Sequence, residues 1–171
     1  DSDIVYYNTD FSGNLLGCYV NNDLENYLPG IEFSIDNEYI WEEPNDHFLH
    51  HELIKLPDGN YLGLIEDVRI GPIPYGPWTT LFQALGYQAN GFTQEFPWVG
   101  DKIVIWDKDT KDIIWEWSTF DYYSMDDYDT ISDTWFQAAT LGRFDWTHCN
   151  ALEYIWSYSN SNIDKIFLSA R

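Results

Sequence analysis

The chain has 171 residues and a formal net charge of −21, from 29 acidic and 8 basic residues. This charge argues against a nucleic-acid partner, which needs clustered Lys and Arg, and against an anionic membrane surface. Hydrophobic residues make up 44% of the chain and aromatic residues 19%, which argues against disorder and favours β structure. The sequence has no apolar run long enough for a transmembrane helix. Because it begins at Asp1 without Met or a signal peptide, we expect a processed or excised fragment.

The first clear element is a hairpin over residues 51–65. Its two apolar runs flank Pro57-Asp58-Gly59-Asn60, in which Pro presets φ and Gly accepts a positive φ. Before it, residues 31–41 resemble the outer strands of an earlier unit of the same kind. After it, residues 72–100 are rich in Gly, Pro and aromatic residues, and we expect an inserted loop with a short helix near residues 80–85.

A second hairpin follows, with strands expected over residues 101–106 and 113–117 and a polar turn between them. The two hairpins together predict four consecutive antiparallel strands. Residues 120–145 are acidic and aromatic without strand alternation, which predicts an irregular or short helical crossover. Further strands are expected at residues 150–156 and 165–169, joined by a turn.

An internal repeat is visible in these hairpins. His50-His51 stands at the start of one hairpin. His148 stands at the start of another, 98 residues after His50 and 97 residues after His51. Four-stranded units that recur with a crossover between them are typical of β-propeller blades. We therefore expect an all-β fold, one partial propeller domain over residues 1–171, in which the first strand of each blade lines a central channel. The two to three blade-like units are expected at about residues 1–47, 48–120 and 145–171.

Residues 145–152, which read Asp-Trp-Thr-His-Cys-Asn-Ala-Leu, contain a candidate anion site. A strand here would place His148 and Asn150 on one face, and a hairpin return would bring Arg171 beside them. Imidazole and guanidinium supply charge-assisted hydrogen bonds and the amide a neutral one, which suits sulfate or phosphate. The alternative is a polar channel with structural hydrogen bonds only.

His50 and His51 are the next candidates. Adjacent residues of a strand point to opposite faces, so at most one of the two would face the channel. Alignment of Leu56 with Tyr154 places His50 opposite His148, and a slip of one residue selects His51 instead.

Other side chains have simpler interpretations. An acidic loop around Asp126 to Asp133 offers oxygen ligands for calcium but lacks the EF-hand pattern, so we expect a solvated loop and no metal or cofactor. Cys18 and Cys149 could form a single disulfide or remain two buried thiols. Arg143 and Asp145 are expected to pair on the surface.

These motifs together resemble the bacterial arylsulfate sulfotransferase propellers. The pieces that match are His50-His51-Glu52-Leu53 with Leu56-Pro57-Asp58-Gly59-Asn60-Tyr61-Leu62, Ile113-Ile114-Trp115-Glu116-Trp117 with Phe120-Asp121, and Asp145-Trp146-Thr147-His148 with Asn150 and Leu168-Ser169-Ala170-Arg171. The resemblance implies a six-bladed β-propeller that is periplasmic or secreted. It also implies transfer of a sulfuryl group from a phenolic sulfate ester to a phenol acceptor without PAPS or another cofactor.

By motif, His148, Asn150 and Arg171 match the family's sulfate-binding residues, and His50 or His51 matches an additional channel histidine. The family's nucleophilic histidine comes later in the chain, and nothing in this sequence matches it. With two to three blades, either a second chain completes the ring or this chain is a fragment.

Two other function classes stay open. A non-catalytic propeller module would bind an anionic or aromatic ligand, or a protein partner, at the mouth of the channel. A structural or surface-assembly protein would fit the acidity and the aromatic content.

Overall fold

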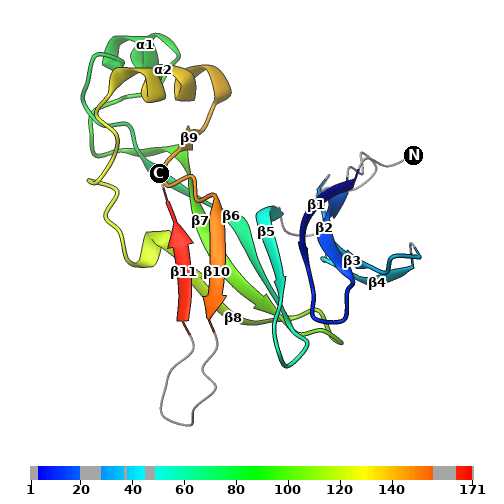
Figure 1. Ribbon diagram of the computed structural model, residues 1–171. Coiled ribbons are helices and arrows are strands. Elements are labelled where there is room, and N and C mark those ends of the chain that lie inside the picture. Colours follow the sequence, from blue (N-terminus) through cyan, green and yellow to red (C-terminus); the bar gives the residue numbers. More distant parts are fainter. Residues whose placement is uncertain (1–3, 20–27, 37, 45–48, 156–164, 171) are drawn as a thin grey trace. The chain divides into compact units, whose positions relative to one another are not determined.

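The chain divides into two compact units. The first unit comprises Asp1–Glu66, Lys102–Trp117 and Cys149–Arg171, and the second comprises Asp67–Asp101 and Ser118–His148. The structure is a computed structural model that describes residues 4–19, 28–36, 38–44, 49–155 and 165–170 (Figure 1).

The first sheet of the first unit has four antiparallel strands in chain order. They are β1 (Ile4–Thr9), β2 (Leu15–Tyr19), β3 (Gly30–Phe33) and β4 (Tyr39–Glu42). The turn between β1 and β2 is held by Asp10, whose Oδ1 accepts hydrogen bonds from the backbone N–H groups of Ser12 and Asn14 at 2.9 and 2.8 Å. Strands β3 and β4 confirm the pair expected within residues 31–41.

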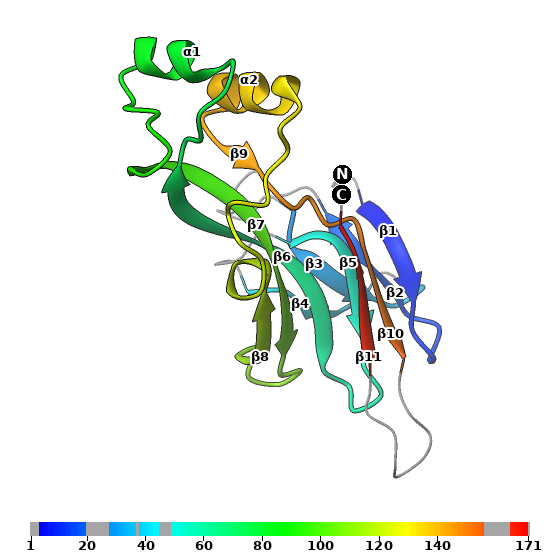
Figure 2. The same cartoon turned by 90° about the vertical axis from the view of Figure 1, so that its left-hand side faces the viewer.

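The second sheet again contains four strands in chain order (Figure 2). They are β5 (Leu49–Lys55), β6 (Tyr61–Pro72), β7 (Gln94–Trp106) and β8 (Ile113–Ser118), and the short β9 (Phe144–Asp145) pairs in parallel with β7. The turn between β5 and β6 is closed by Leu56 N–H donating to Asn60 O at 2.8 Å, and Gly59 has φ +94°. Both predicted hairpins and their four consecutive strands are confirmed.

A separate hairpin follows in the first unit. Strand β10 (Ala151–Ile155) pairs antiparallel with β11 (Lys165–Ser169), and Leu152 lies opposite Leu168. The turn expected at residues 157–162 lies outside the described residues.

Within the first unit, strands β6 and β7 of the second sheet carry buried side chains on both faces, whereas the edge strand β8 exposes Ile114 and Trp115. One face of β6 and β7 carries Tyr61, Ile65, Val104 and Trp106, which pack against the first sheet, and the ring of Trp41 stacks on Tyr61 with centroids 3.9 Å apart. The alternate residues of the same strands pack in the opposite direction, against β10 and β11. This second cluster comprises Leu62, Leu64, Ile103, Leu152 and, partly buried, Leu168. Because side chains alternate strictly between the two faces of a strand, one sheet can pack against a different neighbour on each face.

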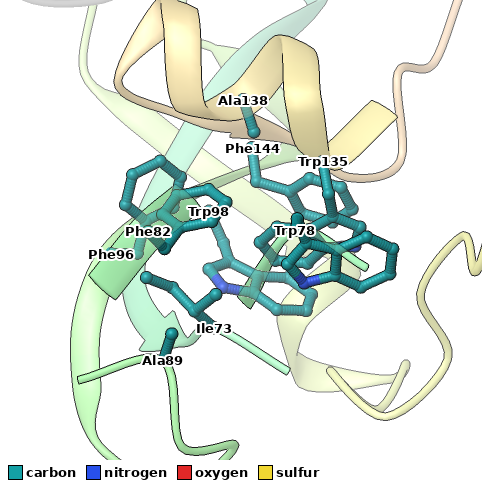
Figure 3. Close-up of a cluster of buried hydrophobic side chains, with 9 residues drawn as sticks. All are labelled: Ile73, Trp78, Phe82, Ala89, Phe96, Trp98, Trp135, Ala138 and Phe144. Carbon is teal, nitrogen blue, oxygen red and sulfur yellow. The ribbon is translucent and has the colours of Figure 1, made fainter. Parts of the chain in front are cut away.

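The second unit is built around an aromatic core (Figure 3). It contains the helices α1 (Thr79–Ala84) and α2 (Ser132–Leu141) and a 3₁₀-helix at Thr119–Asp121. Trp135 of α2 lies at the centre, with its ring stacked on Phe144 at 3.9 Å and near Trp78 and Trp98 at 5.5 Å. Large buried rings supply much of the apolar area that a unit of this size can remove from water.

The expected inserted loop at residues 72–100 is partly wrong. Helix α1 confirms the short helix expected near residues 80–85, but Gln94–Gly100 form the first half of β7. Pro97 and Gly100 obscured the strand pattern, whereas buried Phe96 and Trp98 alternate as they should on a strand. Over the residues that the structure describes, the fold is mostly β, with antiparallel sheets and two short α-helices. Within the described ranges, no helix is long and apolar enough to cross a membrane.

Candidate functional site

The segment from Asp145 to His148 is fixed against strand β7 within the second unit. Asp145 lies opposite Val99 in the β7–β9 register, and Trp146 N–H donates to Val99 O at 2.8 Å. The buried Thr147 hydroxyl donates a short hydrogen bond to the buried carboxylate of Asp101. These contacts therefore fix the backbone immediately before His148.

The imidazole of His148 turns back to Asp145. Its Nδ1 lies 2.6 Å from Asp145 Oδ2, and both side chains are about 40% exposed. Asp145 thus pairs with the histidine three residues later, a contact that the sequence did not predict, and the surface pair with Arg143 stays a prediction. A carboxylate that holds one ring nitrogen fixes the orientation of the imidazole and favours the tautomer with a proton on Nδ1.

This geometry gives His148 two chemical uses. The neutral ring with Nδ1–H directed at Asp145 carries its lone pair on Nε2, which can accept a proton. The protonated ring instead offers Nε2–H as a charge-assisted donor to an anionic oxygen.

The strand expected through His148 and Asn150 is wrong. Residues 146–150 lie between β9 and β10, and His148 has φ +40°, in the left-handed region. Asn150 is exposed, belongs to the first unit, and donates its backbone N–H to Ser169 O at 2.9 Å. Arg171 lies outside the described residues, so the grouping of His148, Asn150 and Arg171 stays a prediction.

His50 and His51 lie in an irregular part of β5. Pairing with β6 is regular from Leu53 onward and shifts register between Leu49 and Leu53, so the histidines occupy a bulge. His51 is exposed with φ +58°, His50 is half-buried, and their ring centroids are 5.6 Å apart. The simple alternation expected for adjacent strand residues therefore fails here. Burial raises the pKa of the neighbouring Glu52 carboxyl.

Left-handed backbone distinguishes His51 and His148 from most of the chain. Among the described residues other than glycine, only these two histidines, Ala89 and Lys111 have positive φ. An L-residue in this region costs about 1–2 kcal/mol, and such strain concentrates at functional sites. Because His148 follows His51 by 97 residues, the shared conformation favours His51 over His50 as the counterpart in the repeat.

A groove that the sequence did not predict lies in the first unit. It has a volume of about 560 Å³ and is lined by residues of β1, β5 and β10 and their adjoining turns, including Phe11, Ile54, Lys55 and Tyr154. Strand β5 contacts both β1 and β10. These are the first strands of the two sheets and of the separate hairpin.

Lys55 closes a buried polar cluster beside this groove. Its Nζ lies 2.7 Å from Glu32 Oε1 and 3.3 Å from Asp10 Oδ2. Glu32 is fully buried, and it also accepts hydrogen bonds from Asn14 Nδ2 at 2.6 Å and from the Tyr61 hydroxyl. The only sequence signal was a Lys at the end of a strand, which has no special meaning before its partners are known.

The electrostatics of the cluster follow from these contacts. Burial opposes ionisation of Asp10, but hydrogen bonds from Ser12 and Asn14 and the Lys55 ammonium outweigh it and lower the pKa of Asp10 to about 2. Burial, together with the nearby Glu32 carboxylate, raises the pKa of the Tyr61 hydroxyl far above its ordinary value.

The two cysteines and the acidic loop are the remaining candidates from the sequence. Cys18 and Cys149 are both buried and are not joined by a disulfide. In the part of the chain that the structure describes, no group of His, Cys, Asp and Glu is arranged to hold a metal ion. In the acidic loop, Asp129 instead accepts hydrogen bonds from Ile131 N–H at 2.8 Å and Thr134 Oγ1 at 2.6 Å.

Comparison of the chain with family models, with curated proteins and with solved structures finds no match.

Proposed function

We propose that this chain is part of an arylsulfate sulfotransferase-like β-propeller and contributes to its sulfate-binding site. The observation that carries the proposal lies in the first unit, where strands β5 to β7 of a four-stranded sheet pack against the first sheet on one face and against the β10–β11 hairpin on the other. Propeller blades are four-stranded antiparallel sheets in chain order that pack face to face.

The arrangement of the first strands supports the same proposal. In a propeller, the first strand of each blade lies nearest the axis, so successive first strands are neighbours. Strands β1, β5 and β10 are such neighbours, and a groove opens among them. A two-layer sandwich would not require the first strands of three successive units to come together.

The outer face of the β10–β11 hairpin is consistent with an incomplete ring. Ile155 and Phe167 are 47% and 51% exposed, on the side of the hairpin away from the buried Leu152. A further blade, from a longer chain or from a second chain, would cover them. We propose a periplasmic or secreted location on the resemblance alone.

The proposed chemistry uses the histidine–aspartate pair. In the net reaction, the S–O bond to the donor aryl oxygen breaks, an S–O bond to the acceptor phenol forms, and the phenol proton ends on the released donor phenol. Sulfuryl transfer spreads charge over oxygens that fixed donors can stabilise, as in phosphoryl transfer. His148, oriented by Asp145, would donate to a sulfuryl oxygen or accept the phenol proton. The covalent histidine implied by the resemblance is not among the matched residues.

A direct test measures binding and transfer separately. Aryl sulfate should quench the Trp fluorescence of the chain, and His148→Gln and Arg171→Gln should each weaken binding, whereas Arg143→Gln should not. In the protein with a complete ring, each of the first two substitutions should slow transfer from para-nitrophenyl sulfate to a phenol about 100- to 1000-fold. Wild-type transfer by both variants would refute the proposal.

A second function is favoured by the groove. Aromatic and apolar side chains line it beside Lys55 and the carboxylates of Asp10 and Glu153, and it has the size of a small-molecule site. A non-catalytic module would bind an anionic or aromatic ligand there. Binding of aryl sulfate that Lys55→Met abolishes and His148→Gln does not, without transfer to any added phenol, would favour this alternative.

A further inference from the structure

We propose that Asp101, acting through Thr147, is a positioning residue that holds His148 in its working tautomer. Asp101 is 2% exposed and Thr147 is 8% exposed, and the Thr147 hydroxyl donates to the Asp101 carboxylate. A buried carboxylate is costly unless it is well hydrogen-bonded, so this contact is a strong constraint on the position of Thr147.

The segment is held to β7 at two points. The first is at Val99, which lies opposite Asp145 and accepts a hydrogen bond from Trp146 N–H at 2.8 Å. The second is at Asp101, two residues further along β7. The contact at Val99 positions the carboxylate of Asp145. The contact at Asp101 positions the backbone that leads into His148.

Asp101 is itself fixed. Its N–H donates to Thr119 Oγ1 at 3.0 Å, and Thr119 is fully buried. The preceding Gly100 packs so closely that an added Cβ would come within 2.6 Å of Thr119 Oγ1 and 2.7 Å of the Phe120 ring. The backbone carrying Asp101 has therefore little freedom to follow a displaced Thr147.

The left-handed conformation of His148 makes this second point necessary. At φ +40° the residue lies outside the broad minima of an L-amino acid, and the surrounding contacts must maintain it. Without the Thr147–Asp101 hydrogen bond, the turn would relax, and the 2.6 Å contact between His148 Nδ1 and Asp145 would open. A neutral imidazole released into water prefers the proton on Nε2, which would remove the lone pair from that nitrogen.

The test is the imidazole tautomer, read by ¹⁵N NMR at alkaline pH. The chain has four histidines, so the His148 signals can be assigned with a His148→Gln variant. The wild-type protein should show the Nδ1–H form. Thr147→Val, which removes the hydroxyl and keeps the branched shape, should shift His148 to mainly Nε2–H. Thr147→Ser, which restores a hydroxyl, should recover the Nδ1–H form.

Thr147→Val leaves a buried carboxylate without this donor and could unfold the segment. The double variant Asp101→Leu/Thr147→Val replaces both partners by apolar groups and should fold, yet it should still show mainly Nε2–H. An Nδ1–H form that persists in Thr147→Val or in the double variant would overturn the proposal.

The expected effect of Thr147 on catalysis rests on the proposed function, whereas the expected tautomer of His148 does not. In the complete protein, Thr147→Val should lower kcat for aryl sulfate with little change in KM, and Thr147→Ser should restore it. A tautomer shift without any transfer activity in the wild type would refute the sulfotransferase proposal and leave the positioning role intact.

Discussion

Glu32 is the buried carboxylate of the polar cluster around Lys55. It is fully buried and contacts Lys55, Asn14 and Tyr61, which come from three separate segments of the first unit. Removal of its charge leaves the Lys55 ammonium with a weaker partner in a place that water reaches poorly, since only 24% of that side chain is exposed.

We therefore expect Glu32→Gln to lower the free energy of unfolding by about 1.5–3 kcal/mol, measured by urea denaturation. The matched control is Glu116→Gln. Glu116 is 56% exposed and pairs with Lys102 at 3.3 Å, so the loss there should stay below about 0.5 kcal/mol. Equal losses in the two variants would contradict the role assigned to the buried cluster.

The lowered pKa of Asp10 predicts a specific acid sensitivity. Because the carboxyl has a pKa of about 2 in the folded chain against an ordinary value of 3.8, its contribution is present above that ordinary value and disappears as pH falls from about 4 to about 2. Asp10→Asn should lower stability at neutral pH and reduce the loss between those two pH values.

The measurement is the urea midpoint of both proteins across that range, taken as a difference so that the other carboxylates cancel. Asp109→Asn, in the exposed turn between β7 and β8, serves as the control and should keep the wild-type acid dependence. A wild-type pH profile in Asp10→Asn would show that the Lys55 and turn contacts do not favour the charged form.

At the scale of elements, the aromatic core of the second unit depends on helix α2. Trp135 is fully buried and stacks on Phe144, whereas its neighbour Phe136 is 39% exposed. Trp135→Ala should cost about 3–5 kcal/mol through lost burial and a cavity.

Phe136→Ala, an aromatic truncation one residue away on the same helix, should cost less than about 1 kcal/mol. Hydrogen exchange should report the same contrast, with faster exchange in residues 132–144 of the Trp135 variant only. Similar losses in both variants would mean that the stacked rings contribute little beyond the average helix position.

Some elements could be predicted from the sequence and others could not. The turn at Pro57–Asn60 was predictable because its hydrogen bonds are local and its residues have strong turn preferences. The first half of β7 was not, because Trp98 and Phe96 take strand geometry from packing in the second unit, against the local preference of Pro97. Tertiary contacts override local propensity in such segments.

The candidate site shows the same division. The histidines were identifiable from their repeat spacing, but the pairing of His148 with Asp145 depends on a left-handed φ that favours Gly or Asn and that the sequence does not indicate at a histidine. The cluster around Lys55 was missed because Asp10, Glu32 and Lys55 come together only when the first sheet packs beside β5.

For the whole molecule, the net charge of −21 is the dominant electrostatic feature. Mutual repulsion of so many carboxylates destabilises a compact chain, and salt screens it by shortening the Debye length from about 30 Å at 0.01 M to about 3 Å at 1 M. The melting temperature at pH 7 should therefore rise as sodium chloride is increased over this range.

The control is the same titration near the isoelectric point of about 4.1, where the net charge vanishes and the gain should shrink. A salt response that is equal at both pH values would indicate general salting-out of apolar surface instead of screened repulsion.

The left-handed backbone at His51 and His148 lowers the stability of the folded chain, and the imidazole ring at each place serves the proposed chemistry. Glycine is the residue that takes φ +58° or +40° with least penalty, so a glycine at either place would relieve the main chain and delete the ring. A laboratory selection for survival at high temperature alone would enrich glycine at both places. Retention of histidine under such selection would require a demand for the imidazole itself.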